Sequence, residues 1–290
     1  MRITTGMQFR SLLSALQQMG SRSATLARQA TSGRRVERPS DDPVAAARLM
    51  VLSTDIARLD QIDRSAEAGQ HVARLVDGTL DALGGLLLDA KQLAVRGASD
   101  GSAIARPAMA DEVDGLAAQI LVTVAVQTEG RYLMSGTRTD QAPFDAAGTY
   151  QGNNDALSAV IEEGQRVVVA PTGANALQGV VDVPLVLQEL ATALRSDDKV
   201  RIQAAMGELD LAFEHVTRMR TRVGSSLVRI ESGLLRRGDH RVALIEEISA
   251  LGDASLPDVL VELAQIDRAR EAALATAARI GQRNLFDFLA

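Results

Sequence analysis

The sequence predicts a mainly α-helical protein: a long antiparallel helical bundle, or coiled-coil rod, built from both chain ends, with a small β-rich insertion. Apolar residues alternate at spacings of three and four over long stretches, which is typical of helices that pack along one another. Hydrophobic residues make up 46% of the chain but aromatic residues only 2%, so we expect an aliphatic core. One central segment loses this periodicity and is rich in glycine, asparagine and short β-branched runs.

The first helical stretch lies near the N-terminus and carries apolar residues at Leu12, Leu16, Met19 and Leu26. Gly33 is predicted to end it, because glycine readily adopts the left-handed conformation that closes many helices. The motif Ser40, Asp41, Asp42, Pro43 then predicts a strong helix start, since capping side chains satisfy free N–H groups and proline is tolerated in a first turn. Asp41 and Asp42 could also be paired for acid–base chemistry or metal binding, but capping accounts for their position.

Two longer stretches form the expected helical body. One extends from Leu52 to Ala94, with 11 apolar residues at 13 pattern positions, and the other from Ile202 to Leu251, with 12 of 15. A shorter helical piece lies between them, through Met109 and Ile120. Four glycines lie inside the longest stretch, and each costs about 1 kcal/mol relative to alanine, so bends or breaks are possible there.

Arginines interrupt the apolar pattern of the longest stretch at Arg220, Arg237 and Arg241. Because a buried charge needs a partner, we expect them to face carboxylates such as Asp55, or other subunits. The cluster of Arg236, Arg237 and Arg241 could instead bind phosphate or an acidic partner.

Between Pro143 and Pro184 the helical period is absent. Ala159–Ile161 and Gln165–Ala170 are predicted to form a β-hairpin, with Gly164 in its turn. We therefore divide the chain into a terminal coiled-coil core that depends on assembly (1–40 and 256–290), a helical rod (41–141 and 184–255) and a small β-rich outer domain (142–183). The insertion is too short for an independent enzyme domain.

The last helix is predicted to carry a second apolar seam at Leu256, Val259, Leu263 and Ile266. Beyond it, the chain places Leu285, Phe286 and Phe288 within its last six residues, so that two of its five phenylalanines lie there. A lone folded chain would gain little stability by leaving so apolar an end exposed to solvent. Either this end docks on the chain's own core or it is covered by neighbouring subunits.

Several classes of function are disfavoured by composition. The absence of cysteine excludes disulfides, thiolate zinc sites and cysteine nucleophiles, and a net charge of −6 argues against binding nucleic acid. No apolar run reaches the ~20 residues of a membrane span, and the N-terminus has no signal-peptide core. The three histidines lack metal-ligand spacing, and neither a G-x-S-x-G elbow nor a phosphate-binding loop is present. We expect no enzyme activity, no metal and no cofactor.

Several segments resemble the flagellin superfamily, and most closely its family of hook–filament junction proteins, also called third hook-associated proteins. The similar segments are Met1–Thr4, Ala30–Val36, Pro39–Arg48, Gly130–Thr139, Tyr150–Asn154 and the ending Asn284–Leu289. Met134 stands where that family is expected to carry an aromatic residue. The resemblance is strongest at both ends and in the helical body, and weakest in the compact insertion from about Ala142 to Val183.

The resemblance implies a non-enzymatic protein of the flagellar axis, whose terminal helices pair into an inner core that neighbouring subunits order. It implies export without a cleaved signal peptide, to an extracellular site at the junction between hook and filament. The implied partners are a ring of copies of the chain itself, a hook-side hook-associated protein, flagellin and a flagellar export chaperone, with no nucleic acid and no membrane. Three alternatives stay open: a flagellin-type filament subunit, a cytoplasmic coiled-coil adaptor and, most remotely, an enzyme.

Overall fold

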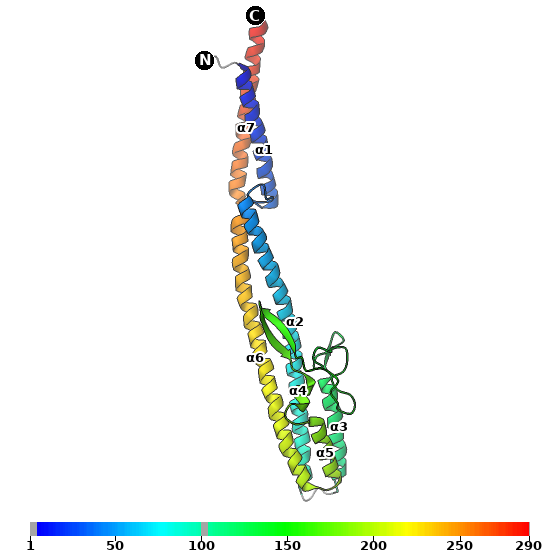
Figure 1. Cartoon of the computed structure of the whole chain (residues 1–290). Helices are drawn as coiled ribbons and strands as arrows, with labels where there is room; N and C mark the ends of the chain where they lie inside the picture. The colour runs from blue at the N-terminus through cyan, green and yellow to red at the C-terminus, as the bar shows by residue number, and fades with distance from the viewer. Residues whose placement is uncertain (1–4, 100–103, 290) are drawn as a thin grey trace. The chain divides into compact units, whose positions relative to one another are not determined.

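The computed structural model describes residues 5–99 and 104–289, with side-chain surroundings given mainly from residue 10 to residue 278. This part of the chain forms helices and two small antiparallel sheets (Figure 1). The elements in order are α1 (Thr5–Ser32), α2 (Pro43–Ala98), α3 (Arg106–Val124), β1 (Gln127–Thr128), β2 (Arg131–Tyr132), β3 (Leu157–Glu162), β4 (Gln165–Ala170), α4 (Gly173–Gln178), α5 (Val183–Arg195), α6 (Lys199–Gly252) and α7 (Leu256–Leu289). The predicted fold class, mainly α with long helices and a small β-rich insertion, is confirmed.

The chain divides into two compact units. The first joins the residues up to Ala57 with those from His240 onward, and the second is Arg58–Asp239. The helices α2 and α6 each contribute to both units. The division into three parts made from the sequence stays a prediction.

In the first unit α1 packs along α7 (Figure 1). Helix α1 is closed by Gly33, whose φ is +69° and whose N–H donates to the carbonyl of Gln29 at 2.9 Å, as its sequence position predicts. The carbonyl of Gly33 accepts from the N–H of Ala254 at 2.9 Å, and the N–H of Arg35 donates to the carbonyl of Gly252 at 2.7 Å. These backbone bonds join the α1–α2 connection to the α6–α7 connection.

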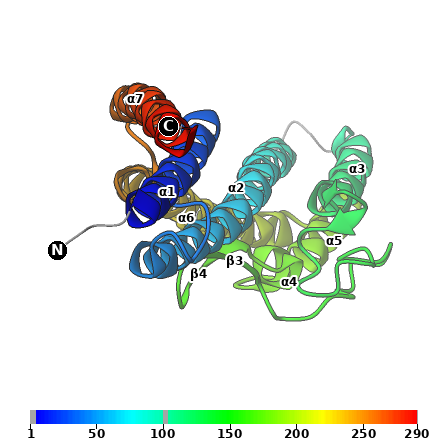
Figure 2. The same cartoon turned by 90° about the horizontal axis from the view of Figure 1, so that it is seen from above.

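The core of the second unit is aliphatic, as the composition predicts. Helix α3 packs along α5 (Figure 2), and the apolar faces of α2 and α6 supply most of the remaining core. The residues with at most 2% exposure include Leu80, Leu83, Leu87, Leu93, Val113, Ile120, Leu187, Leu190, Ile202, Leu209, Val216 and Ile230. Ion pairs flank this apolar seam, for example Arg74 with Glu231 at 3.3 Å.

The predicted β-hairpin is confirmed in β3 and β4, which pair antiparallel. Gly164 has φ +73° in the turn, where glycine avoids the strain of a side chain. Gly69 in α2 lies beneath the hairpin. A Cβ at this position would come within 2.3 Å of the Cβ of Ala159, so the missing side chain lets α2 and β3 approach closely.

The structure corrects the prediction in the segment between Pro143 and Pro184, which contains the short helix α4 as well as strands. The side chain of Thr172 caps α4 by accepting from the N–H of Asn175 at 3.2 Å. Asp182 caps α5 in the same way, through the N–H of Leu185 at 3.1 Å. With six residues, α4 is too short to show a clear apolar period. Helix α6 is continuous from Lys199 to Gly252 despite its internal glycines.

Candidate assembly surface

The terminal helix pair, α1 with α7, holds most of the residues predicted to form the assembly seams. Arg22 pairs with Glu262 at 2.8 Å, while Gly33 meets Ala254 at the base of the pair. These two contacts fix the register of the antiparallel helices. In this register Leu26 on α1 lies at the level of Val259 on α7. Leu26 is 1% exposed and Val259 is 7% exposed. The pair is therefore well packed at this level.

Burial is less complete elsewhere along the terminal helix pair. The half-buried members of the predicted seams are Leu12, Leu16, Met19, Leu263 and Ile266. Leu256 is 45% exposed, and further apolar side chains beyond the predicted set are about half exposed or more, among them Leu260, Val261 and Leu274. The side chains of Leu285, Phe286 and Phe288 lie outside the described residues. The described part of the pair thus leaves a large amount of apolar surface uncovered.

The two aspartates of the helix-start motif stabilise two different turns. Helix α2 begins at Pro43, and Oδ1 of Asp42 accepts from the N–H of Ala45 at 3.0 Å. Asp41 instead accepts from the N–H groups of Glu37 and Arg38, at 3.2 and 2.9 Å, and so holds the turn before the helix. Ser40 is exposed. The hydrogen bond from Ala45, followed by the bond from Arg35, lowers the pKa of Asp42.

Substitution of Asp42 by alanine should lower the thermal stability of the protein more at pH 7 than at pH 2. Because the fold lowers the pKa of Asp42 below 3.8, its carboxylate stabilises the protein at neutral pH, and this stabilisation is lost as the pH falls through the folded-state pKa. Thermal unfolding followed by circular dichroism would measure this. Ser40→Ala is the matched control and should match the wild type at both pH values. An equal Asp42→Ala deficit at pH 7 and pH 2 would contradict the capping role.

Two of the three seam arginines, Arg220 and Arg237, face carboxylates of the same chain. Arg237 is 6% exposed; its Nε donates to Oδ1 of Asp63 at 2.5 Å, and its Nη1 donates to the carbonyl of Ile161. Arg220 pairs with Asp77 at 3.1 Å and also with Asp81. The hydrogen bond to Asp77 raises the pKa of this guanidinium. The expected carboxylate partners thus exist, although they are not Asp55.

A buried arginine that the sequence reasoning missed stands at the start of α3. Arg106 is 2% exposed and donates to the carbonyls of Gly97 at 2.7 Å and Ser99 at 2.8 Å. It also pairs with Asp197, a residue with φ +60° in the α5–α6 turn. Arg106 thereby ties the end of α2 to the turn before α6. No periodic pattern marks this residue, because its partners are backbone carbonyls and a turn.

Two of the segments that resemble the junction-protein family, Gly130–Thr139 and Tyr150–Asn154, contact each other in the second unit. The side chain of Asn153 accepts from the N–H of Thr137 at 2.8 Å and donates to its hydroxyl at 2.6 Å. The hydroxyl of Tyr150 donates to the carbonyl of Met134 at 3.2 Å and to the carbonyl of Asn153 at 2.9 Å. Burial raises the pKa of this phenol. The two motifs therefore build one hydrogen-bonded substructure.

Gly136 and Met134 show why this substructure needs particular residues. Gly136 has φ +70°, and a Cβ there would lie 2.4 Å from the carbonyl oxygen of Asn153. Met134 is fully buried, so the position expected to be aromatic is filled by a flexible apolar side chain. Its carbonyl also accepts from the N–H of Gly173 at 2.6 Å, which links the substructure to α4.

The described residues contain no helix long and apolar enough to cross a membrane. Across the same residues, no group of three or more histidine, aspartate or glutamate side chains is arranged to hold a metal ion. The described site consists of partly exposed apolar helix faces, capped turns and ion pairs along the helix contacts.

Residues 3–139 match the family model of the bacterial flagellin N-terminal helical region. Flagellar hook-associated protein 3 of Salmonella typhimurium is 30% identical over 179 residues. Over these segments the chain is similar to proteins of the flagellin superfamily. The match covers 60% of this chain and 56% of the Salmonella protein. The chain therefore spans little more than half the length of that relative.

Solved structures show a similar fold. FlgL of Bacillus cereus aligns with a TM-score of 0.59 and 21% identity, over 69% of this chain and 99% of that chain. The flagellar junction protein FlgL of Legionella pneumophila aligns with a TM-score of 0.58 and 14% identity, over 72% and 100%. The predicted resemblance to hook–filament junction proteins is confirmed as a similarity.

Proposed function

We propose that this chain is a structural subunit of the junction between the hook side and the filament of a bacterial flagellum. The observation that carries this proposal is its similarity to flagellar hook-associated protein 3, 30% identical over 179 residues. The partly uncovered terminal helix pair supports it, because a subunit that completes its core with neighbours needs such surface. The role is non-enzymatic.

The partners that fit this role are a ring of further copies, a hook-side hook-associated protein and flagellin. In the assembled ring, the seam of Leu12, Leu16 and Met19 pairs with that of α7, whose members are Leu256, Val259, Leu263 and Ile266. Leu285, Phe286 and Phe288 add apolar burial between subunits, worth about 1.5–3 kcal/mol for each large side chain. The chain leaves the cell by flagellar export without a cleaved signal peptide, and an export chaperone accompanies it.

Deletion of the gene tests the proposal directly. We expect hooks without filaments and flagellin secreted into the medium, because filament subunits would have no junction on which to polymerise. Electron microscopy of the hooks and gel analysis of the medium would measure this, with the gene restored in trans as the control. Normal filaments on the deletion strain would overturn the proposal.

A filament subunit of the flagellin type is the second candidate, because the matched family model is that of the flagellin N-terminal region. Self-assembly separates the two roles. A filament subunit polymerises into long filaments on its own, whereas a junction subunit does not. A third candidate, a cytoplasmic coiled-coil adaptor, would be absent from sheared flagella.

A further inference from the structure

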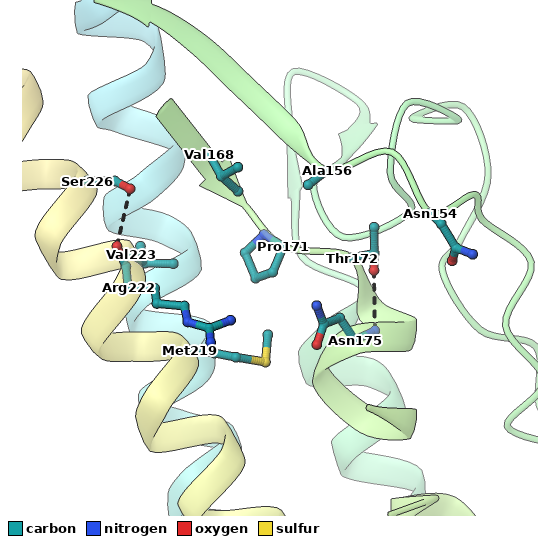
Figure 3. A pocket seen from close by; sticks show the side chains of 10 residues that line it. All are labelled: Asn154, Ala156, Val168, Pro171, Thr172, Asn175, Met219, Arg222, Val223 and Ser226. Atoms are coloured by element: carbon teal, nitrogen blue, oxygen red, sulfur yellow. Dashed lines mark hydrogen bonds between the residues drawn. The ribbon is translucent and has the colours of Figure 1, made fainter. Parts of the chain in front are cut away.

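A pocket of about 240 Å³ lies in the second unit, between α6, the end of β4 and the start of α4 (Figure 3). It is separate from the terminal helix pair and from the buried ion pairs. Its lining residues come from three places in the sequence, the segments 154–156, 168–175 and 219–226. The volume suits one or two amino-acid side chains and is below that of an ordinary small-molecule site.

The walls of the pocket are largely apolar. Met219 and Val223 are each 3% exposed, while Val168 on β4 is 48% exposed. The hydroxyl groups in the pocket are already engaged, since Thr172 caps α4 and Ser226 donates to the carbonyl of Arg222 at 3.2 Å. An aliphatic side chain would therefore find apolar contacts here without leaving a hydroxyl group unsatisfied.

Polar groups at the pocket remain available for a ligand. In the described part of the chain, the side chains of Arg222 and Asn154 have neither an ion pair nor a hydrogen bond. Asn175 has its Oδ1 3.3 Å from Nε2 of His215, which leaves its amide nitrogen available. Figure 3 shows Arg222 and Asn175 on facing walls, one from α6 and the other from α4. By contrast, Arg220, Arg236 and Arg237 of α6 each pair with a carboxylate.

We propose that the pocket receives a segment from a second copy of this chain, with a carboxylate on Arg222 and an adjacent aliphatic side chain against Met219 and Val223. A guanidinium presents a planar set of donors that fits a carboxylate, and such charge-assisted bonds are stronger than neutral ones. The amide nitrogen of Asn175 supplies a further donor. The inference rests on the proposed function, which brings copies side by side in a ring.

Charge complementarity argues for a second copy as the occupant. The unit Arg58–Asp239 contains 25 acidic and 18 basic residues, so the same unit of a neighbour offers surplus carboxylates to an unpaired arginine. Side-chain pairs of the required kind occur on it. On α5, for example, Leu185 is 50% exposed and the exposed Glu189 lies one helical turn further along.

Site-specific cross-linking in assembled flagella tests the inference. A photoreactive amino acid at Val168 should yield an adduct of two copies of this chain, identified by mass and by peptide sequencing. Arg222→Glu should abolish that adduct, and Arg222→Lys should retain part of it. A photoreactive residue at Val95, which is 49% exposed on α2 and away from the pocket lining, is the control, and its adducts should not respond to Arg222→Glu.

The outcomes separate this inference from the proposed function. If the protein is present at the junction but Val168 forms no self-adduct, or forms adducts only with a different protein, the inference is overturned and the proposed function stands. A self-adduct that survives Arg222→Glu also overturns it. If the protein is absent from sheared flagella, both fail.

Discussion

Removal of residues 1–39 and 256–290 should abolish attachment of this protein to hooks while leaving its second unit folded. The deletion removes α1 and α7, including the buried pair Leu26 and Val259 and the uncovered seam residues. Each large apolar side chain buried between subunits contributes about 1.5–3 kcal/mol, so losing the whole set should leave no measurable binding. The assay would add purified protein to hooks from the deletion strain, so that the result does not depend on export.

Tyrosine fluorescence supplies the control for folding of the truncated protein. The chain has no tryptophan and only two tyrosines, Tyr132 and Tyr150, both in the second unit. That unit has its own buried core, so its fluorescence transition in urea should match that of the full chain. A milder variant, Leu26→Ala with Val259→Ala, should attach weakly. Attachment of the truncated protein at wild-type strength would contradict the role of the terminal helices.

The long helices were predictable because each repeats one simple pattern many times. In α6 a single apolar period extends over about fifteen turns, and the bounds Lys199–Gly252 follow from it closely. Local chemistry was equally informative where one residue decides the backbone. Gly33 and Gly164 have positive φ, and Pro43 opens α2, as predicted from residue type alone.

The elements that escaped prediction depend on contacts between segments distant in sequence. Helix α4 is too short to show a period, and Arg106 is fixed by carbonyls and a turn. The carboxylate partner of Arg237 lies 174 positions away in sequence, so spacing along one helix could not identify Asp63. The pocket at Arg222 likewise draws on three segments. Periodicity predicts which face a helix buries, but not which polar group lies opposite each charge.

Substitution of Arg237 by methionine should destabilise the second unit by about 3–5 kcal/mol, the cost of removing one partner of a buried ion pair. Arg237 and Asp63 have side chains that are 7% and 15% exposed, and the same guanidinium binds the carbonyl of Ile161 in β3. Methionine keeps most of the volume but removes every donor. The loss should therefore weaken the attachment of the hairpin to α2 and α6 as well. Urea denaturation followed by tyrosine fluorescence would measure it.

Two further variants decide whether charge or packing causes the loss. Arg218→Ala removes an exposed arginine paired with Glu214 at 3.4 Å, and an exposed pair of this kind contributes at most about 0.5 kcal/mol. The double variant Arg237→Met with Asp63→Leu should be more stable than Arg237→Met alone, because it removes a largely buried carboxylate that has lost one of its partners. A double variant no better than the single one would assign the loss to packing. A single variant that loses less than about 1 kcal/mol would show that the buried pair does not anchor the hairpin.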